Sequence, residues 1–206
     1  MARARNLPVP SGGPVAARVT SAILNFVSDI PPTRERKRSD PESAARARAN
    51  SAAAKAAMAA GSLALPPGPL GWLTILPEMI AVWKIQSQMV SDIAALYGKK
   101  ASLTREQMIY CLFRHTAAQA VRDLAVRTGE RVLVRRASLD AVQNIVERVG
   151  VRITHKALGK GISRWLPLVG AGFVGAYAYY DTTQVAQTAI ELFEREIDID
   201  PEPIDA

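Results

Sequence analysis

The sequence contains one pair of residues that could form a nucleophile. Cys111 and His115 are four positions apart, so on a helix they would lie on the same face. A histidine beside a cysteine can take its proton and create the reactive thiolate. Both residues, however, fall within an apolar stripe, where a cysteine usually serves as packing. We therefore predict no catalytic residue here. The remaining interior acids follow no spacing that is typical of an acid–base pair: Asp92, Asp123, Asp140 and Asp181.

A glycine motif later in the chain has the spelling of a dinucleotide-binding loop. Residues 170–175 read GAGFVG, which matches GxGxxG. That loop binds a pyrophosphate only where it joins a parallel strand to a helix. The preceding segment, KGISRWLP, does not resemble a strand. Small residues four positions apart instead allow two helices to approach closely. We predict no cofactor and assign the motif to helix packing through Gly170, Ala171, Gly172, Gly175 and Ala176.

The composition excludes several classes of site. A single cysteine excludes an intrachain disulfide and a four-cysteine zinc site, and two histidines leave little for a histidine-based metal site, so we expect no metal. Apolar residues make up 49% of the 206 residues, which excludes global disorder, yet the net charge is +7. Such a chain is either a soluble, alanine-rich helical protein or one that lies against an anionic membrane. The composition leaves both open.

The charge is unevenly distributed along the chain. Residues 191–206 hold seven acids and one base, whereas the preceding residues are basic. We expect a flexible basic N-terminal arm over residues 1–40, an all-α domain over residues 41–195, and an acidic, disordered tail over residues 196–206. Within the arm, residues 15–28 are expected to form a short amphipathic helix and residues 34–40 (RERKRSD) a charged linker.

Apolar periodicity predicts a compact all-α bundle of five or six helices. Besides residues 15–28, we expect helices over residues 41–61, 73–97, 105–128, 138–159 and 167–195. Asp40, Thr104 and Ser138 are candidate N-caps, and Gln107 completes a capping box with Thr104. Residues 131–136 (RVLVRR) fit either a strand or a helix. Because no partner strand is visible, we expect a helix or a loop there.

Two stretches without charge could contact a membrane. Residues 56–77 are long enough to span a bilayer, but they contain five helix breakers in six positions. We therefore expect a helical hairpin, either buried or dipping into lipid, whose turn consists of Pro66, Pro67, Gly68, Pro69 and Gly71. Residues 165–180 would form a helix of ~24 Å, shorter than the ~30 Å hydrocarbon core. Tyr177, Tyr179 and Tyr180 lie at one end of this stretch, as in an interfacial anchor. A buried core helix fits the same stretch equally well.

Basic residues recur every four positions after residue 147. On a helix they would form one slanting ridge, which either faces solvent or contacts anionic lipid headgroups. Nucleic acid is a weaker interpretation, because no aromatic residues alternate with the charges to stack on bases. The residues assigned to lipid contact are Arg148, Arg152, Lys156, Lys160 and Arg164, together with Trp165.

Two motifs resemble those of EcsC-family proteins. The first runs from LPPGPLGWL at residues 65–73 to IAALYG at residues 93–98, and the second from LPLVGAG at residues 166–172 to YDTT at residues 180–183. The second also resembles the glycine helix of related GTPase-associated helical membrane domains. The resemblance covers about residues 56–193. It implies an all-α bacterial protein that is associated with membranes or with an exporter-linked process, and it supplies no catalytic residues.

We therefore expect a non-enzymatic, membrane-associated accessory protein that contacts anionic lipid, a protein partner or both. It would lie peripherally or monotopically on the inner membrane of a bacterium, in the cytoplasm, since the N-terminal residues lack the pattern of a secretory signal. The alternatives are a soluble helical interaction module and a small enzyme that acts on lipids. No small-molecule substrate is indicated.

Overall fold

The computed structural model describes residues 13–27, 29–63, 71–128, 131–134, 136–159 and 167–194. Helices contain 77% of these residues, so the all-α class is confirmed. The described residues form seven α-helices where we expected five or six. One of the additional helices, α5 (Ala118–Val121), is a single turn.

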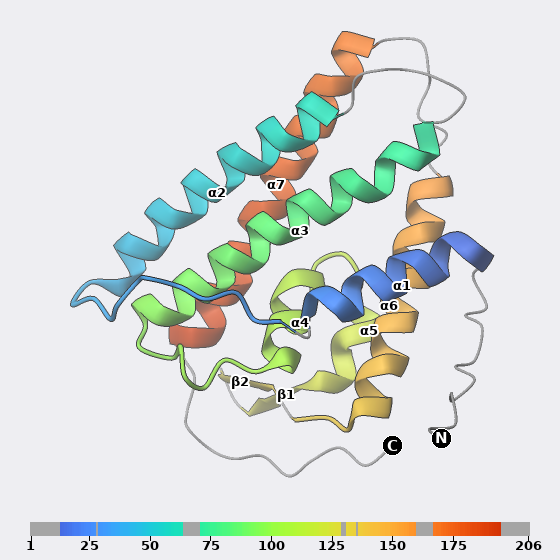
Figure 1. Cartoon of the computed structure of the whole chain (residues 1–206). Helices are drawn as coiled ribbons and strands as arrows, with labels where there is room; N and C mark the ends of the chain where they lie inside the picture. Colours follow the sequence, from blue (N-terminus) through green and yellow to red (C-terminus); the bar gives the residue numbers. More distant parts are fainter. Residues whose placement is uncertain are drawn as a thin grey trace, which may run out of the picture.

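Three long helices lie side by side: α2 (Pro41–Leu63), α3 (Gly71–Leu96) and α7 (Pro167–Glu194) (Figure 1). Helix α2 runs antiparallel to α7, because Gly175 near the start of α7 lies against Ala57 near the end of α2. Helix α3 runs parallel to α7, and Gln86 at its middle donates a hydrogen bond to Thr182 at the middle of α7. The end of α2 and the starts of α3 and α7 therefore share one end of this layer.

The remaining elements cover one side of the three-helix layer (Figure 1). Helices α1 (Gly13–Val27) and α6 (Leu139–Gly159) pack against each other. Beside the first half of α6 and below α1 in Figure 1 lie α4 (Arg105–Phe113), α5, a 3-10 turn (Arg122–Leu124) and two short strands. Val19 and Ile23 of α1 are buried in the main core, so the described part of the predicted flexible arm is packed rather than free.

Helix α4 is the centre of the core. Every residue from Glu106 to Phe113 is buried, including the polar Glu106 and Gln107. The rings of Phe113 and Trp83 of α3 meet edge to face, with centroids 5.5 Å apart. An aromatic pair of this geometry stabilises the fold by ~0.5–1.5 kcal/mol beyond the free energy that comes from its buried area.

Local signals set most helix boundaries where we expected them. The capping box of Thr104 and Gln107 is formed, with both reciprocal hydrogen bonds present. The side chains of Asp40 and Ser138 accept hydrogen bonds from the backbone of the first turns of α2 and α6. Beyond α3, Gly98 adopts a φ of 79°, a left-handed conformation that glycine adopts without strain.

The expected helix over residues 105–128 is wrong beyond Phe113. The chain leaves the helical conformation at Ala117, whose φ of −136° and ψ of 42° lie outside the helical region. It then forms an antiparallel pair, β1 (Ala125–Thr128) and β2 (Arg131–Val134). Two such segments separated by two residues, one of them glycine, are typical of a hairpin. The partner that residues 131–136 lacked was therefore inside the segment that we had assigned to a helix.

Replacement of Gly175 tests the close approach of α2 and α7. A Cβ atom at this position would lie 3.0 Å from the carbonyl oxygen of Ala57, and a backbone oxygen cannot move aside as a side chain can. We expect Gly175→Val to lower the free energy of unfolding by about 1–3 kcal/mol, measured by urea denaturation. The control is Ala176→Val, an exposed position on the same turn, where the loss should be about 0.5 kcal/mol. Equal losses would show that the close contact is unimportant.

Candidate functional site

The end shared by α2, α3 and α7 is poor in charge. Helix α2 carries no charged residue after Lys55, and α7 carries none before Asp181. In α3 the only charged residue before Lys84 is Glu78. Ala56, Ala60 and Ala178 form a small separate cluster in which α2 and α7 pack closely. The fold therefore gathers uncharged segments that are distant in the sequence.

Several large side chains are exposed between this end and the middle of the layer. Met58 of α2 is 74% exposed, and Tyr177 and Tyr180 of α7 are 50% and 60% exposed. Tyr179 is 42% exposed, while Ala178 between Tyr177 and Tyr179 faces α2. Burial of part of its ring raises the pKa of Tyr177, and the charge of Asp181 adds to this. These tyrosines form a band below the uncharged end.

A largely buried polar network lies at the level of the tyrosines. His115, just beyond the end of α4, approaches Asp181 of α7 with 2.6 Å between Nε2 and Oδ1. Gln86 of α3 is fully buried and donates a hydrogen bond of 2.7 Å to Oδ2 of the same carboxylate. Because a carboxylate only accepts hydrogen bonds, Nε2 of His115 must carry a proton. Asp181 thus joins α3, the end of α4 and α7.

The network engages His115, the histidine that could pair with Cys111. Nδ1 of His115 and Oε1 of Gln86 are buried atoms without a hydrogen-bond partner among the described residues. Cys111 is fully buried in the core, and His115 is engaged by Asp181. This arrangement supports packing, rather than a nucleophile, as the role of Cys111.

Two of the predicted lipid-contact residues can be placed in full. Arg148 and Arg152 are exposed on α6, and Nη1 of Arg152 donates a 2.8 Å hydrogen bond to Gln119. Lys156 belongs to α6, but its side chain is not among those described. Lys160, Arg164 and Trp165 lie outside the described residues. Helix α6 rises toward the uncharged end, so its second half brings basic residues closer to that end (Figure 1).

The predicted packing and turn residues have mixed outcomes. Gly175 makes the close contact with α2, whereas Ala176 is exposed and does not contribute to it. Gly170, Ala171 and Gly172 belong to α7, but no side-chain environment is described for them. Gly71 is the first residue of α3. The other turn residues lie outside the described part of the chain: Pro66, Pro67, Gly68 and Pro69.

The sequence did not reveal the partnership of His115 and Asp181. They are 66 positions apart, and no local spacing connects them. The only signal was the position of Asp181 within the YDTT motif of residues 180–183. Among the described residues, no cluster of histidine, cysteine and acidic side chains could hold a metal ion. Within the same residues, no helix is long and apolar enough to cross a membrane.

Asp181→Asn tests the network. An asparagine presents one acceptor and one donor group to His115 and Gln86, so either one hydrogen bond is lost or His115 must change tautomer and place its N–H at the unpartnered Nδ1. We expect the free energy of unfolding to fall by about 1–3 kcal/mol in urea denaturation. The control is Asp92→Asn, since Asp92 is also partly buried but accepts from Gln88 of its own helix, so that it joins no separate helices. A loss no larger than that of the control would contradict a structural role for the network.

Comparisons with known proteins identify no relative of this chain. No family model, no curated protein and no solved structure matches the chain. The likeness to EcsC-family proteins thus remains a resemblance of two motifs.

Proposed function

We propose that this protein is a non-enzymatic, helical accessory protein that attaches to an anionic membrane surface through the shared end of α2, α3 and α7. The observation that carries the proposal is the exposed set of Met58, Tyr177 and Tyr180 beside this uncharged end. Tyrosine is enriched where a protein crosses from water to lipid, because its ring is apolar and its hydroxyl is polar. The resemblance to EcsC-family proteins agrees with membrane association in a bacterium.

The attachment would be monotopic. The last uncharged part of α2, residues 56–63, is ~12 Å long at ~1.5 Å per residue. This length suits burial to the boundary between headgroups and acyl chains, which is ~5–10 Å deep. The tyrosine band would then lie at headgroup level, and the polar network of Asp181 would remain within the protein below the lipid.

Basic residues of α6 would supply the electrostatic part of the binding. Arg148 and Arg152 are exposed on the helix that rises toward the uncharged end. A basic side chain near an anionic bilayer contributes ~1 kcal/mol. Apolar contact and charge together give an attachment that salt weakens but does not abolish.

Vesicle binding tests the apolar contact. The double variant Tyr177→Ser/Tyr180→Ser should bind about tenfold more weakly to vesicles of phosphatidylglycerol and phosphatidylcholine. The reason is that two aromatic rings that would contact the lipid are removed. Both side chains are exposed, so the fold should persist. Leu139→Ser is the matched control, since Leu139 is an exposed apolar residue at the start of α6, the end of that helix that lies away from the proposed membrane contact. If the tyrosine variant binds as well as this control, the attachment surface is wrong.

Sedimentation with the same vesicles tests the electrostatic contribution of α6. Arg148→Gln/Arg152→Gln should weaken binding at low salt about fivefold for each charge, which corresponds to ~1 kcal/mol. The control is Arg34→Gln/Arg36→Gln, which removes two exposed charges from the far end of the three-helix layer. The absence of vesicle binding by the unaltered protein at low salt would overturn the proposed function and favour a soluble interaction module.

A further inference from the structure

The segment between α1 and α2 is attached to α3 rather than free. Residues 31–38, here called the strap, contain no helix or strand. Three side chains donate hydrogen bonds to consecutive strap carbonyl groups, and the backbone N–H of Arg38 donates one to Leu96. The three donors are Ser91 to Pro31 (2.6 Å), Gln88 to Pro32 (3.0 Å) and Lys100 to Thr33 (2.8 Å). The expected charged linker is therefore held in one place.

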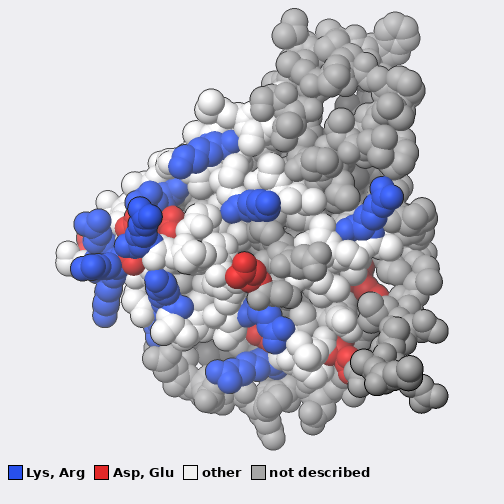
Figure 2. Space-filling model, viewed as in Figure 1, with Lys and Arg blue, Asp and Glu red and all other residues white. Residues whose placement is uncertain are grey.

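The strap presents cations to solvent. Its only acid, Glu35, has a side chain that is 15% exposed and pairs with Arg48 of α2. The outward charges of the strap are thus all positive: Arg34, Arg36, Lys37 and Arg38 are exposed. Figure 2 shows the basic side chains gathered over this end of the molecule, where α2 begins.

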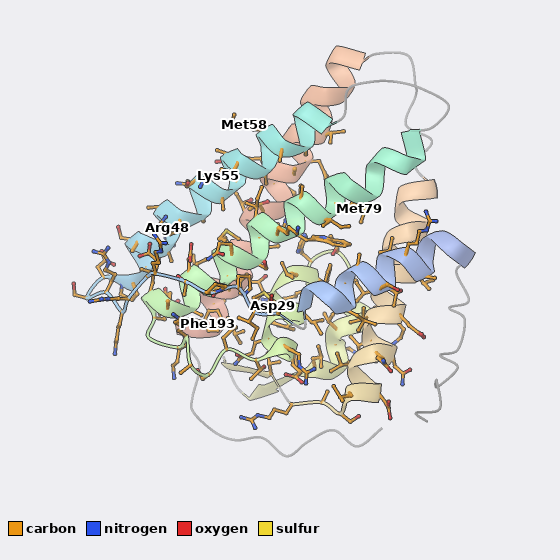
Figure 3. The ribbon with its side chains drawn as sticks, in the orientation of Figure 1. Asp29, Arg48, Lys55, Met58, Met79 and Phe193 are labelled. Carbon is orange, nitrogen blue, oxygen red and sulfur yellow. The ribbon has the colours of Figure 1, made fainter. Side chains whose placement is uncertain are left out.

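Helix α7 ends beside the strap. Figure 3 places Phe193, the penultimate residue of α7, toward the same end of the molecule as Arg48. Glu194, the last residue of α7, acts electrostatically on the side chains around it. Burial raises the pKa of Tyr97 to about 12, with Glu194 as the second cause. The pKa of Arg46 is raised mainly by its hydrogen bond and charge interaction with Glu42, and slightly by Glu194. The chain therefore leaves α7 near Tyr97, which follows the strap-bonded residue Leu96, where Glu42, Asp40 and Arg46 also act electrostatically on Tyr97.

The residues that follow are complementary to the strap in charge. After Arg195, residues 196–206 contain five acids and no base. Four of them occupy every second position, which would place them on one side of an extended segment: Glu196, Asp198, Asp200 and Glu202. Twelve residues reach up to ~40 Å at ~3.3 Å per residue. They can therefore extend across the strap from the end of α7.

We propose that the strap is a binding surface for an acidic polypeptide segment, and that its occupant is residues 195–206 of the same chain. Each exposed ion pair contributes only ~0–1 kcal/mol. The tether compensates for this, because a short flexible link gives an effective concentration in the millimolar range. Several weak ion pairs are then enough to hold the segment on the strap, and added salt weakens them by screening the charges. The proposal is independent of the membrane contact, which uses the opposite end of the three-helix layer.

Zero-length carbodiimide cross-linking of the full chain tests the proposal. In single-chain species, we expect mass spectrometry to find amide links from Lys37 or Lys100 to acids of residues 196–205. Lys55 and Lys84, exposed elsewhere on the layer, should form few such links. The yield should fall severalfold between about 0.01 M and 1 M salt, as the Debye length shrinks from ~30 to ~3 Å.

A matched pair of variants separates local contact from overall charge. Arg34→Gln/Arg36→Gln/Arg38→Gln should lower the yield severalfold. Arg18→Gln/Arg122→Gln/Arg136→Gln removes the same charge from exposed positions outside the strap and should leave the yield unchanged. Links distributed equally over the four lysines, or an equal loss in both variants, would overturn the proposal. Because it does not involve lipid, failure of vesicle binding would leave it standing.

Discussion

The close packing of α2 on its neighbours determines the arrangement of the whole chain. The buried face of α2 consists of alanines, at positions 45, 49, 52, 53, 56 and 60. With no larger side chain between them, α7 can approach until Gly175 meets the backbone of Ala57. Alanine also has the highest helix propensity, so the same residues form the helix and allow the contact. The alignment of the three helices, and hence which segments share an end, follows from this contact.

This alignment separates two kinds of surface. At one end lie the uncharged segments of α2 and α7 with their exposed tyrosines. At the other end lie the strap and the start of α2, with the basic side chains. Asp181 is the first charged residue of α7, and it lies where the helix passes beneath the tyrosines. Its carboxylate can be mostly buried because His115 and Gln86 donate to it, as buried polar groups require.

Local signals in the sequence predicted the elements well, and long-range partnerships were not predictable. The caps at Asp40, Thr104 and Ser138 depend on residues within one turn, so single-sequence patterns find them. The pairing of β1 with β2 was missed because apolar spacing alone fits a helix as well as a short strand. The contacts of Asp181 and of the strap join residues 56–95 positions apart, and no pattern of spacing encodes those distances.

The length of the three-helix layer determines whether its two ends can influence each other through charge or only through movement of the helices. Helix α3, with 26 residues, is ~39 Å long, several times the Debye length of ~8 Å at physiological salt. Charges on the strap therefore have little effect on the proposed membrane contact at the opposite end, and a mechanical connection is needed for one end to influence the other. Helix α7 is continuous between the tyrosines and the acidic segment, so a shift along its axis would move both. The hydrogen bonds that Asp181 accepts from His115 and Gln86 oppose that shift, because it would leave a partly buried carboxylate without its donors.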